Sequence, residues 1–469
     1  MNTNGSEFLG LCAIGGEVAF HNELKLNGFT LTEKFPGRVF FKRTDNNAKN
    51  KPCDTVQNVS GKKPKRRIIR KEKIQALQNT AKENLNNSSS LQSEVLSEKE
   101  ASTVNDAEYA NTADTTELFT AMVHANMNLQ LADRIALVVA KFPCADFDDL
   151  FAGLYNCNWE AFFYQDSKVV IDKVNSRNSK LNSARAIQSV AQKAIYKKLC
   201  SKWHLQMLSE SGDTFNVRIY LENDIAAVTL DLSGEALHKR NYRKDAVLAP
   251  LRETTAAMML QLMHWKRKTP LHDPFCGSGT IPIEATLYAH NVPSGILRSF
   301  TFQNFALFNN AHFKQIFENE KIQGLLRVQT GNLVRITGSD IANSAVALAA
   351  RNAENACSLI EAELQKIGRN EKLTRPEFVQ ADIAELSAPY ETGLLIGNPP
   401  YGERLGDEAE ARDIYKKIAQ STKEFPHWQR AFITNLPDLK EILLAYNSRL
   451  YIKEQILKSG KLDTVLYEF

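Results

Sequence analysis

The stretch Asn398-Pro399-Pro400-Tyr401 carries the residue types best suited to chemistry on a flat amine. It follows an apolar run that predicts a buried strand, and proline cannot continue a sheet because it has no N–H. The loop would therefore lie at the carboxyl edge of a sheet, where α/β proteins bind ligands. There the Asn398 side chain and the Pro399 carbonyl could accept two hydrogen bonds from an exocyclic NH₂ and direct its lone pair towards an electrophile. Tyr401 offers a flat face to a base; a rigid turn without chemistry is the alternative.

A second candidate is Asp273-Pro-Phe-Cys-Gly-Ser-Gly-Thr280, between a short predicted strand and a predicted helix. Gly277 and Gly279 permit a tight turn and a close approach of a ligand to the backbone. The helix that follows would offer free N–H groups to a carboxylate or phosphate. The stretch is neither a dinucleotide fingerprint nor a Walker loop, because the third glycine and the Gly-Lys-Ser/Thr ending are absent. A plain turn between strand and helix is the alternative interpretation.

Two further acids end predicted strands: Asp340 in Gly338-Ser-Asp340, and Asp382 in Val379-Gln-Ala-Asp-Ile383. An acid at a second strand end suits the ribose hydroxyls of a nucleotide. The separation of 67 positions from Asp273 to Asp340 exceeds the roughly 20 of the usual fingerprint. Each acid alone could be a helix N-cap. Acids at three successive strand ends favour a ligand-binding edge instead.

These residues need a scaffold, and from about residue 246 the sequence alternates strands and helices. The predicted strands are 270–273, 334–340, 377–382, 393–398, 430–435, 449–456 and 462–469, and the clearest helices are 281–290 and 342–357. Such alternation is typical of a parallel sheet wrapped by helices. We therefore expect an α/β fold with a doubly wound, mostly parallel sheet.

The first half of the chain divides differently. Residues 7–43 predict a strand, a helix at 17–26 and two further strands, whereas 45–115 contain a single aromatic residue, Tyr109, and have a composition typical of disorder. Residues 118–140 and 183–199 predict helices, and 215–232 a hairpin. The predicted parts are an N-terminal unit at 1–44, an insert at 45–115, a middle domain at 116–245 and the α/β domain at 246–469.

Composition limits the function classes. The 469 residues carry a formal net charge of only +4, which excludes a globally supercharged nucleic-acid binder but allows local basic patches. Residues 168–202 hold nine basic residues and one acid, a pattern suited to phosphate contacts; a solvated helical face is the alternative. Seven cysteines without a C-x-x-C pair argue against a disulfide scaffold or a zinc finger. No signal peptide or membrane span is expected.

Together, the four strand-end motifs resemble those of class I S-adenosylmethionine-dependent amino methyltransferases. The longer Asn398-Pro-Pro-Tyr-Gly-Glu-Arg-Leu405 resembles the bacterial THUMP-containing 23S rRNA guanine-N2-methyltransferases of the RlmL type. Residues 231–243 resemble the junction into that family's catalytic domain, although Asn241 stands where the family generally has Gly, and residues 249–254 resemble the family's helix beside the cofactor. The resemblance covers about 8–43 and 116–469 and implies a ferredoxin-like start and a THUMP RNA-binding domain at 116–245.

The resemblance implies a role for each residue. Asp273 and the glycines would line the methionine part of S-adenosylmethionine, Asp340 would bind its ribose and Asp382 its adenine. Asn398, Pro399, Pro400 and Tyr401 would hold and stack the target base. The implied cofactor-binding residues are Asp273, Phe275, Gly277, Gly279, Thr280, Asp340, Ile341, Asp382, Ile383 and Asn398, and the implied RNA-binding residues are Arg177, Lys180, Arg185 and Lys193.

The expected product is N2-methylguanosine in RNA, with 23S rRNA favoured over tRNA. No metal and no obligate protein partner are expected, and the chain is expected to be cytoplasmic. Cys276 could suggest a nucleophile for C5 methylation, but the Asn-Pro-Pro-Tyr loop favours amine chemistry. A non-catalytic RNA-binding or assembly factor with a vestigial methyltransferase fold is the alternative function.

Overall fold

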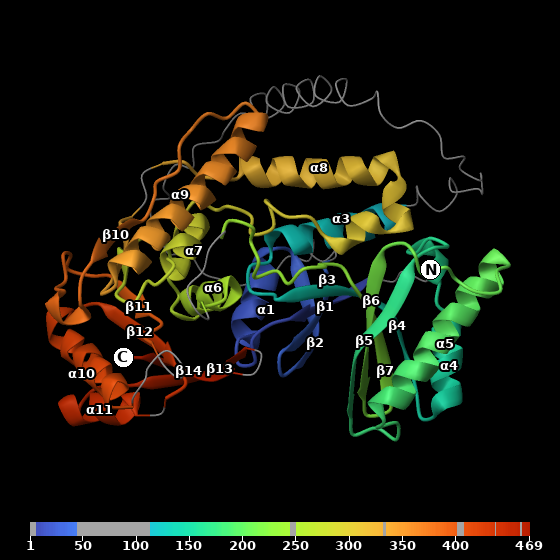
Figure 1. Ribbon diagram of the computed structural model, residues 1–469, viewed down its shortest axis with the longest axis horizontal. Coiled ribbons are helices and arrows are strands. Elements are labelled where there is room, and N and C mark those ends of the chain that lie inside the picture. The colour runs from blue at the N-terminus through green and yellow to red at the C-terminus, as the bar shows by residue number, and fades with distance from the viewer. Residues whose placement is uncertain are drawn as a thin grey trace, which may run out of the picture.

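The computed structural model describes residues 6–44, 113–243, 250–331, 334–400, 408–436, 438–459 and 462–469. Within these ranges the chain forms two seven-stranded sheets with helices packed on them. Figure 1 shows the two sheets side by side along the long axis of the molecule. The N-terminal strands of the first sheet lie in the centre of the view, next to the C-terminal hairpin of the second sheet. The predicted insert at 45–115 lies outside the described residues up to residue 112.

The first sheet combines strands from the N-terminal unit and the middle of the chain. Its order is β2-β3-β1-β4-β7-β6-β5, and only the pairing of β5 with β6 is parallel. Its strands are β1 (Glu7–Leu11), β2 (Phe29–Phe35), β3 (Arg38–Arg43), β4 (Arg134–Pro143), β5 (Lys168–Arg177), β6 (Thr214–Glu222) and β7 (Ile225–Asp231). The predicted helix at 17–26 is confirmed as α1 (Glu17–Leu26) and the hairpin at 215–232 as β6 and β7.

The predicted helix at 118–140 is wrong in its second half. Helix α3 covers Ala113–Asn128, and residues 134–143 form strand β4 instead. Ile135 and Leu137, two positions apart, both belong to the main apolar core, as expected for side chains on one face of a strand. Strand β4 pairs with β1 on one side and β7 on the other. These two partners are distant in sequence, so tertiary pairing decides the structure of this segment.

The second sheet is doubly wound, as predicted. Its order is β10-β9-β8-β11-β12-β14-β13, in which the first five strands are parallel neighbours and the last two antiparallel. The strands are β8 (Leu271–Asp273), β9 (Ile336–Asp340), β10 (Glu377–Gln380), β11 (Leu394–Gly397), β12 (Gln429–Thr434), β13 (Lys453–Ser459) and β14 (Leu462–Glu468). The order turns back between β8 and β11, and α/β sheets bind ligands at such a switch point.

Helices surround both sheets. On the first sheet these are α1, α3, α4 (Phe147–Tyr155) and α5 (Ala184–Trp203). The second sheet carries α6 (Glu253–Leu262), α7 (Thr280–Ala289), α9 (Asn343–Lys366), α10 (Glu408–Glu424) and α11 (Leu439–Tyr446). Among the described helices, none is both long enough and apolar enough to cross a membrane.

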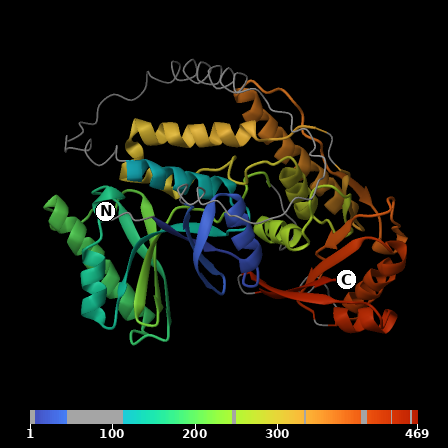
Figure 2. The same ribbon diagram turned by 180° about the vertical axis from the view of Figure 1, so that it is seen from behind.

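An insertion between β8 and β9 joins the two halves. It forms the short turns η3 (Thr301–Asn304) and η4 (Ala306–Asn309) and helix α8 (Ala311–Leu326). Helix α8 lies alongside α3 in both views (Figures 1 and 2) and packs against it. Phe119 of α3 stacks on Phe313 of α8 with ring centroids 4.5 Å apart. One continuous apolar core therefore runs from the first sheet into the second.

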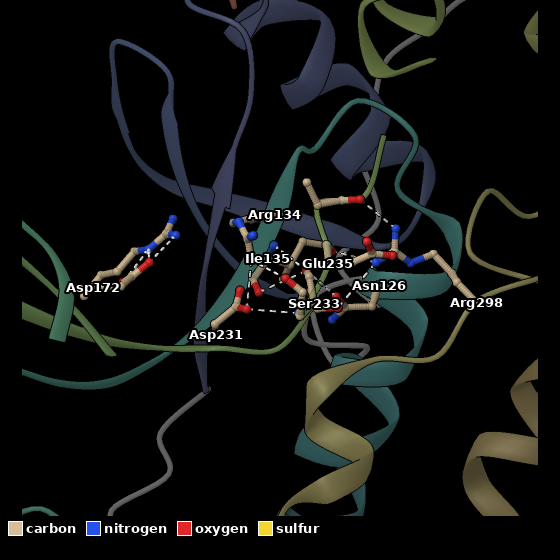
Figure 3. A network of polar contacts seen from close by, with 11 residues as sticks. Asn126, Arg134, Ile135, Asp172, Asp231, Ser233, Glu235 and Arg298 are labelled. Carbon is tan, nitrogen blue, oxygen red and sulfur yellow. Dashed lines mark hydrogen bonds and ion pairs between the residues drawn. The ribbon is translucent and has the colours of Figure 1, made fainter. Parts of the chain in front are cut away.

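Arg298 binds the backbone of the linker between the sheets, which is the segment from β7 to α6. Its guanidinium is buried, and it donates to the carbonyl oxygens of Ala236 and Lys239 at 2.8 Å and of Glu235 at 2.6 Å. Figure 3 shows this side chain reaching the linker near Ser233, whose hydroxyl donates to Asn126 of α3 at 2.8 Å. Burial, followed by the like charge of Arg240, lowers the pKa of Arg298 to about 10.

The C-terminal hairpin touches the N-terminal unit. Ile14 exchanges two backbone hydrogen bonds of 3.0 Å with Lys458 of β13, and the Gln455 side chain donates to the Gly15 carbonyl at 2.9 Å. Gly15 has a φ of +93°, and a Cβ there would lie 1.9 Å from the Ile456 carbonyl oxygen. Only glycine fits this contact. The predicted four-part division stays a prediction; its boundary at 115/116 falls inside α3.

Candidate functional site

The polar residues singled out in the sequence follow four neighbouring strands. The sheet order β10-β9-β8-β11 puts Asp382, Asp340, Asp273 and Asn398 in that order along one edge. The register agrees, because Gly338 of β9 pairs with Asp273 and Asp340 pairs with Gln380 of β10. Parallel strands end at the same edge of a sheet, so these side chains share one ligand-binding edge.

Asp273 is the most deeply buried of the acids. Its Oδ1 accepts a 3.0 Å hydrogen bond from the Phe275 N–H, and Gly397 of the neighbouring strand leaves space beside it, since a Cβ there would lie 3.2 Å from the same oxygen. Burial, with a smaller contribution from the charge of Asp340, raises the pKa of Asp273 well above its ordinary value. A cationic donor at this position would stabilise the ionised carboxylate.

Asn398 lines the same cavity from the next strand. Its side chain is only 9% exposed, and its Oδ1 has no hydrogen-bond donor among the described residues. A buried acceptor without a donor costs free energy, and in a ligand site the donor can come from the ligand. The cavity is open to solvent and encloses about 310 Å³ including that open space, and its lining includes Pro250, Leu251, Asp273, Phe275, Cys276, Gly277, Ser278, Thr280, Ile281 and Asn398.

The loop from 274 to 280 forms the floor of the cavity. Gly277 and Gly279 both have positive φ, +52° and +85°, which explains glycine at both positions. A Cβ on Gly279 would also come within 3.0 Å of the Cβ of Ala349 in α9. Asn352, on the same helix, donates to the Ser278 carbonyl at 3.1 Å and holds the loop against α9.

Cys276 is a buried member of this loop. Burial, followed by the charges of Asp273 and Asp340, raises the pKa of its thiol well above the ordinary value. A thiol in this environment resists ionisation, and the thiolate is the form that acts as a nucleophile. Burial therefore disfavours covalent chemistry at Cys276, and amine chemistry at the Asn398 loop stays the prediction.

Asp340 connects the loop to strand β9. Its Oδ2 accepts the Gly277 N–H and its Oδ1 the Ala342 N–H, each at 3.0 Å. The second bond is of the kind that caps a helix start, the alternative interpretation, while the first orients the carboxylate towards the cavity loop. The neighbouring Ile341 is 68% exposed, unusually high for a large apolar side chain, and is free to contact a ligand ring.

Asp382 lies at the outer end of the edge and caps the short turn η5 (Ile383–Glu385). Its Oδ1 accepts the Ala384 N–H at 2.9 Å, and its Oδ2 pairs with the Lys417 ammonium of α10 at 2.5 Å. Ile383, one of the implied cofactor-binding residues, is buried in a cluster with residues of α10, and its role at the cofactor stays a prediction. Sequence reasoning missed Lys417, which lies 35 positions after Asp382 and outside every motif.

Pro399 is buried and Pro400 half-buried directly after Asn398. Tyr401, predicted to stack on a base, lies outside the described residues, as do the residues up to 407. The structure thus brings Asp273, Asn398 and the glycine loop together at one cavity, with Asp340 bonded to the loop. Asp382 and Ile383 lie further along the edge, beyond Asp340.

The basic residues of 168–202 lie on β5, α5 and the turn between them, away from the second sheet in Figure 1. Their side chains are exposed and make no ion pair among the described residues; they are Arg177, Lys180, Arg185 and Lys193. By contrast, Arg218 on β6 forms a bidentate pair with Asp172, and Lys141 on β4 pairs with Glu7 and Glu33. Unpaired cations are the ones available to phosphates.

A metal site is not evident in the part of the chain that the structure describes. No three or more His, Cys, Asp or Glu side chains gather there in a group that could hold a metal ion. The expectation of metal-free chemistry stays a prediction. The described cysteines are all free thiols.

Comparisons with known proteins agree with this geometry. The UPF0020 family model, described as an RMKL-like methyltransferase domain, matches residues 240–467. YpsC of Bacillus subtilis strain 168, named "Putative RNA methyltransferase", is 33% identical over 74% of this chain and 85% of its own length. The ribosomal RNA large subunit methyltransferase K/L of Shewanella baltica strain OS195 is 34% identical over 65% of this chain, which spans only 41% of that protein.

Solved structures resemble the whole chain. A possible methylase from Clostridium difficile 630 has a TM-score of 0.73 and 24% identity, with 99% of this chain and 98% of that chain covered. SMU.472, described as "a putative methyltransferase complexed with SAH", has a TM-score of 0.69 and 25% identity at the same coverage. The likeness extends over both sheets and supports a class I methyltransferase fold with an N-terminal extension.

Proposed function

We propose that this chain, which belongs to the RMKL-like methyltransferase family together with YpsC, transfers a methyl group from S-adenosylmethionine to the exocyclic N2 amine of a guanine in RNA. The observation that carries the proposal is the row of acceptors along one sheet edge, ending in the buried Asn398 Oδ1 that has no donor. Class I methyltransferase geometry and the names of the relatives support the reaction class.

The residues at the edge fit the proposed cofactor. S-adenosylmethionine presents donors along its length, namely an ammonium, two ribose hydroxyls and a purine amine. Asp273 and Asp340 offer carboxylate oxygens for the first two, and Asp382 offers one for the third. The positive φ of the cavity glycines lets the backbone approach a ligand closely. When bound, the cofactor would supply an electrophilic methyl group on a sulfonium, which departs as a neutral thioether.

For the target amine, the chain supplies positioning. The lone pair of guanine N2 is delocalised into the ring, so the free amine is a poor nucleophile. The Asn398 side chain and the Pro399 carbonyl would accept its two N–H bonds and favour a pyramidal nitrogen. These contacts strengthen as positive charge develops on the nitrogen, so they lower the barrier more than they tighten binding. After transfer, the nitrogen releases one proton to solvent. We expect the Tyr401 ring to stack on the base.

The RNA would be held by the unpaired cations of β5 and α5. A base inside paired RNA must then be extruded to reach the cavity. Replacing Arg177, Lys180 and Arg185 together by Ala should weaken RNA binding and flatten its salt dependence by about one unit per lost contact. Lys141→Ala is the matched control, because its ammonium already pairs with two carboxylates. Equal salt slopes in the triple variant and the wild type would move the RNA-binding face elsewhere.

The identity of the product tests the function as a whole. Purified protein is incubated with S-adenosylmethionine and either 23S rRNA or tRNA, and the RNA is digested and analysed by mass spectrometry. We expect N2-methylguanosine, with 23S rRNA as the substrate we favour and the cytoplasm as its site. N6-methyladenosine or a C5-methylpyrimidine would overturn the substrate assignment. S-adenosylhomocysteine binding without methylation of either RNA would favour a non-catalytic RNA-binding factor.

A further inference from the structure

We propose that Lys417 is a positioning residue for the cofactor's purine: it holds the Asp382 carboxylate in the orientation that accepts the purine amine. The inference rests on the proposed function, since it assigns a role within the same cofactor site. Nothing in the strand-end motifs points to α10, and the ammonium reaches the site only through packing of that helix.

The contact is specific in geometry. Lys417 Nζ lies 2.5 Å from Asp382 Oδ2, while Oδ1 accepts the Ala384 N–H at 2.9 Å. Both oxygens are thus restrained, one by the backbone of η5 and one by a charge from a different element. With the ion pair removed, the carboxylate would keep only the backbone bond and could rotate about its side-chain torsions. Although partial burial acts to raise it, these two donors hold the pKa of Asp382 below its ordinary value.

Helix α10 is itself fixed in place, which makes the lysine a rigid support. Ile383 of η5 is buried in the same apolar cluster as Tyr415, Ile418 and Ala419 of α10. The Tyr415 hydroxyl forms a 2.5 Å hydrogen bond with the Thr434 hydroxyl at the end of β12. Helix and turn are thereby joined on either side of Lys417, whose side chain is 36% exposed. A flexible surface lysine would not restrain a carboxylate in this way.

The neighbouring lysine supplies a matched control. Lys416 precedes Lys417 on the same helix and pairs with Asp413 at 3.0 Å, one turn away. That pair is far more exposed, with 65% and 71% of the two side chains accessible, and it does not include Asp382. Lys416→Met therefore changes charge and helix propensity as Lys417→Met does, but leaves Asp382 untouched.

The primary experiment measures S-adenosylhomocysteine binding by calorimetry. Lys417→Met should weaken the affinity by about threefold to tenfold, the range expected for a partly exposed charge-assisted contact. Lys417→Arg should return it to within about twofold, because a guanidinium can make the same pair. In turnover assays the KM for S-adenosylmethionine should rise while kcat stays unchanged, because purine binding is equal in ground and transition states. Lys416→Met should match the wild type.

Two further measurements separate positioning from a merely structural role. In an Asp382→Asn background, Lys417→Met should have no additional effect, because the two side chains act through one contact. An analogue with a carbonyl in place of the purine amine, S-inosylhomocysteine, should bind wild type more weakly than S-adenosylhomocysteine. The ratio of the two affinities should be smaller in Lys417→Met, since the Asp382 carboxylate that accepts the amine is no longer held in place.

The outcomes distinguish this inference from the proposed function. If the wild type fails to bind S-adenosylhomocysteine, the proposed function fails. If the wild type binds and Lys417→Met binds equally well, the function stands and the positioning role is overturned. Tighter binding by Lys417→Met would also overturn it, because the lysine would then compete with the purine. An equal loss for both analogues would trace the effect to general destabilisation of the helix.

Discussion

Replacing Asn398 by Ala should reduce turnover and leave the protein at least as stable as before, two changes of opposite sign from one side chain. Losing a preorganised contact to the reacting group costs on the order of a hundredfold in kcat. The same Oδ1 is buried without a donor in the free protein. An unsatisfied buried acceptor costs about 1–3 kcal/mol, so its removal offsets the loss of packing around the truncated side chain. Residues selected for function are often kept at such a cost in stability.

The assay pairs single-turnover methylation with thermal unfolding of the ligand-free protein. Each kcal/mol corresponds to roughly 2–4 °C in Tm for a domain of this size, so we expect an unchanged or higher Tm for Asn398→Ala. Asn435→Ala is the matched control, because Asn435 is exposed and follows the end of the next strand, β12. A fully active Asn398→Ala enzyme would refute the amine-holding mechanism. A Tm lower by several degrees would refute the reasoning about the unsatisfied oxygen.

Three further predictions concern other parts of the molecule. Asp340→Ala should weaken S-adenosylhomocysteine binding at least about tenfold in calorimetry, since charge-assisted hydrogen bonds contribute about 1.5–3 kcal/mol each; unchanged affinity would leave Asp340 as a helix cap only. Arg298→Met should lower the free energy of unfolding by about 2–5 kcal/mol in urea titrations, because it leaves the carbonyl oxygens of the linker without their hydrogen-bond donor. Burial raises the pKa of Glu284 to about 7, so it destabilises the fold increasingly as pH rises from about 4.5 to 7. The difference in Tm between Glu284→Gln and the wild type should therefore be more positive at pH 8 than at pH 5. The same difference in Tm at both pH values would contradict this.

Much of the catalytic sheet could be predicted from the sequence because local signals agree with the tertiary structure. The run before Asn398 is apolar on both faces, as expected for a parallel strand covered by helices, and two prolines mark its end. The glycines at 277 and 279 are needed for positive φ values that the structure contains. Acids at strand ends predicted a shared edge because parallel strands align their carboxyl ends. In these places a single short segment carried enough information.

The rest depends on contacts between distant segments. Residues 134–140 alternate weakly and could continue the preceding helix, but β1 and β7 on either side make them a strand. Ile383, an implied cofactor-binding residue, is buried because α10 packs over η5, which its own segment does not indicate. The same packing places the Lys417 ammonium next to the Asp382 carboxylate. No pattern in either segment encodes the pairing, since each segment alone is an ordinary amphipathic turn or helix.

The joint between the two sheets, meaning the apolar core and contacts that they share, also depends on residues that are distant in sequence. It bears on substrate recognition. Phe119 and Phe313 come from segments almost 200 residues apart, yet their rings stack in a core shared by both halves. Arg298 and the contact of Ile14 with Lys458 fasten the joint at two other places. Interfaces between domains that move relative to one another are smaller and more polar. A joint with a continuous apolar core instead holds the cations of β5 and α5 at a constant separation from Asn398. Under the proposed function, an RNA bound at those cations would present only nucleotides at that separation to the cavity, so selection of the target base would depend on RNA shape as well as on contacts to the base.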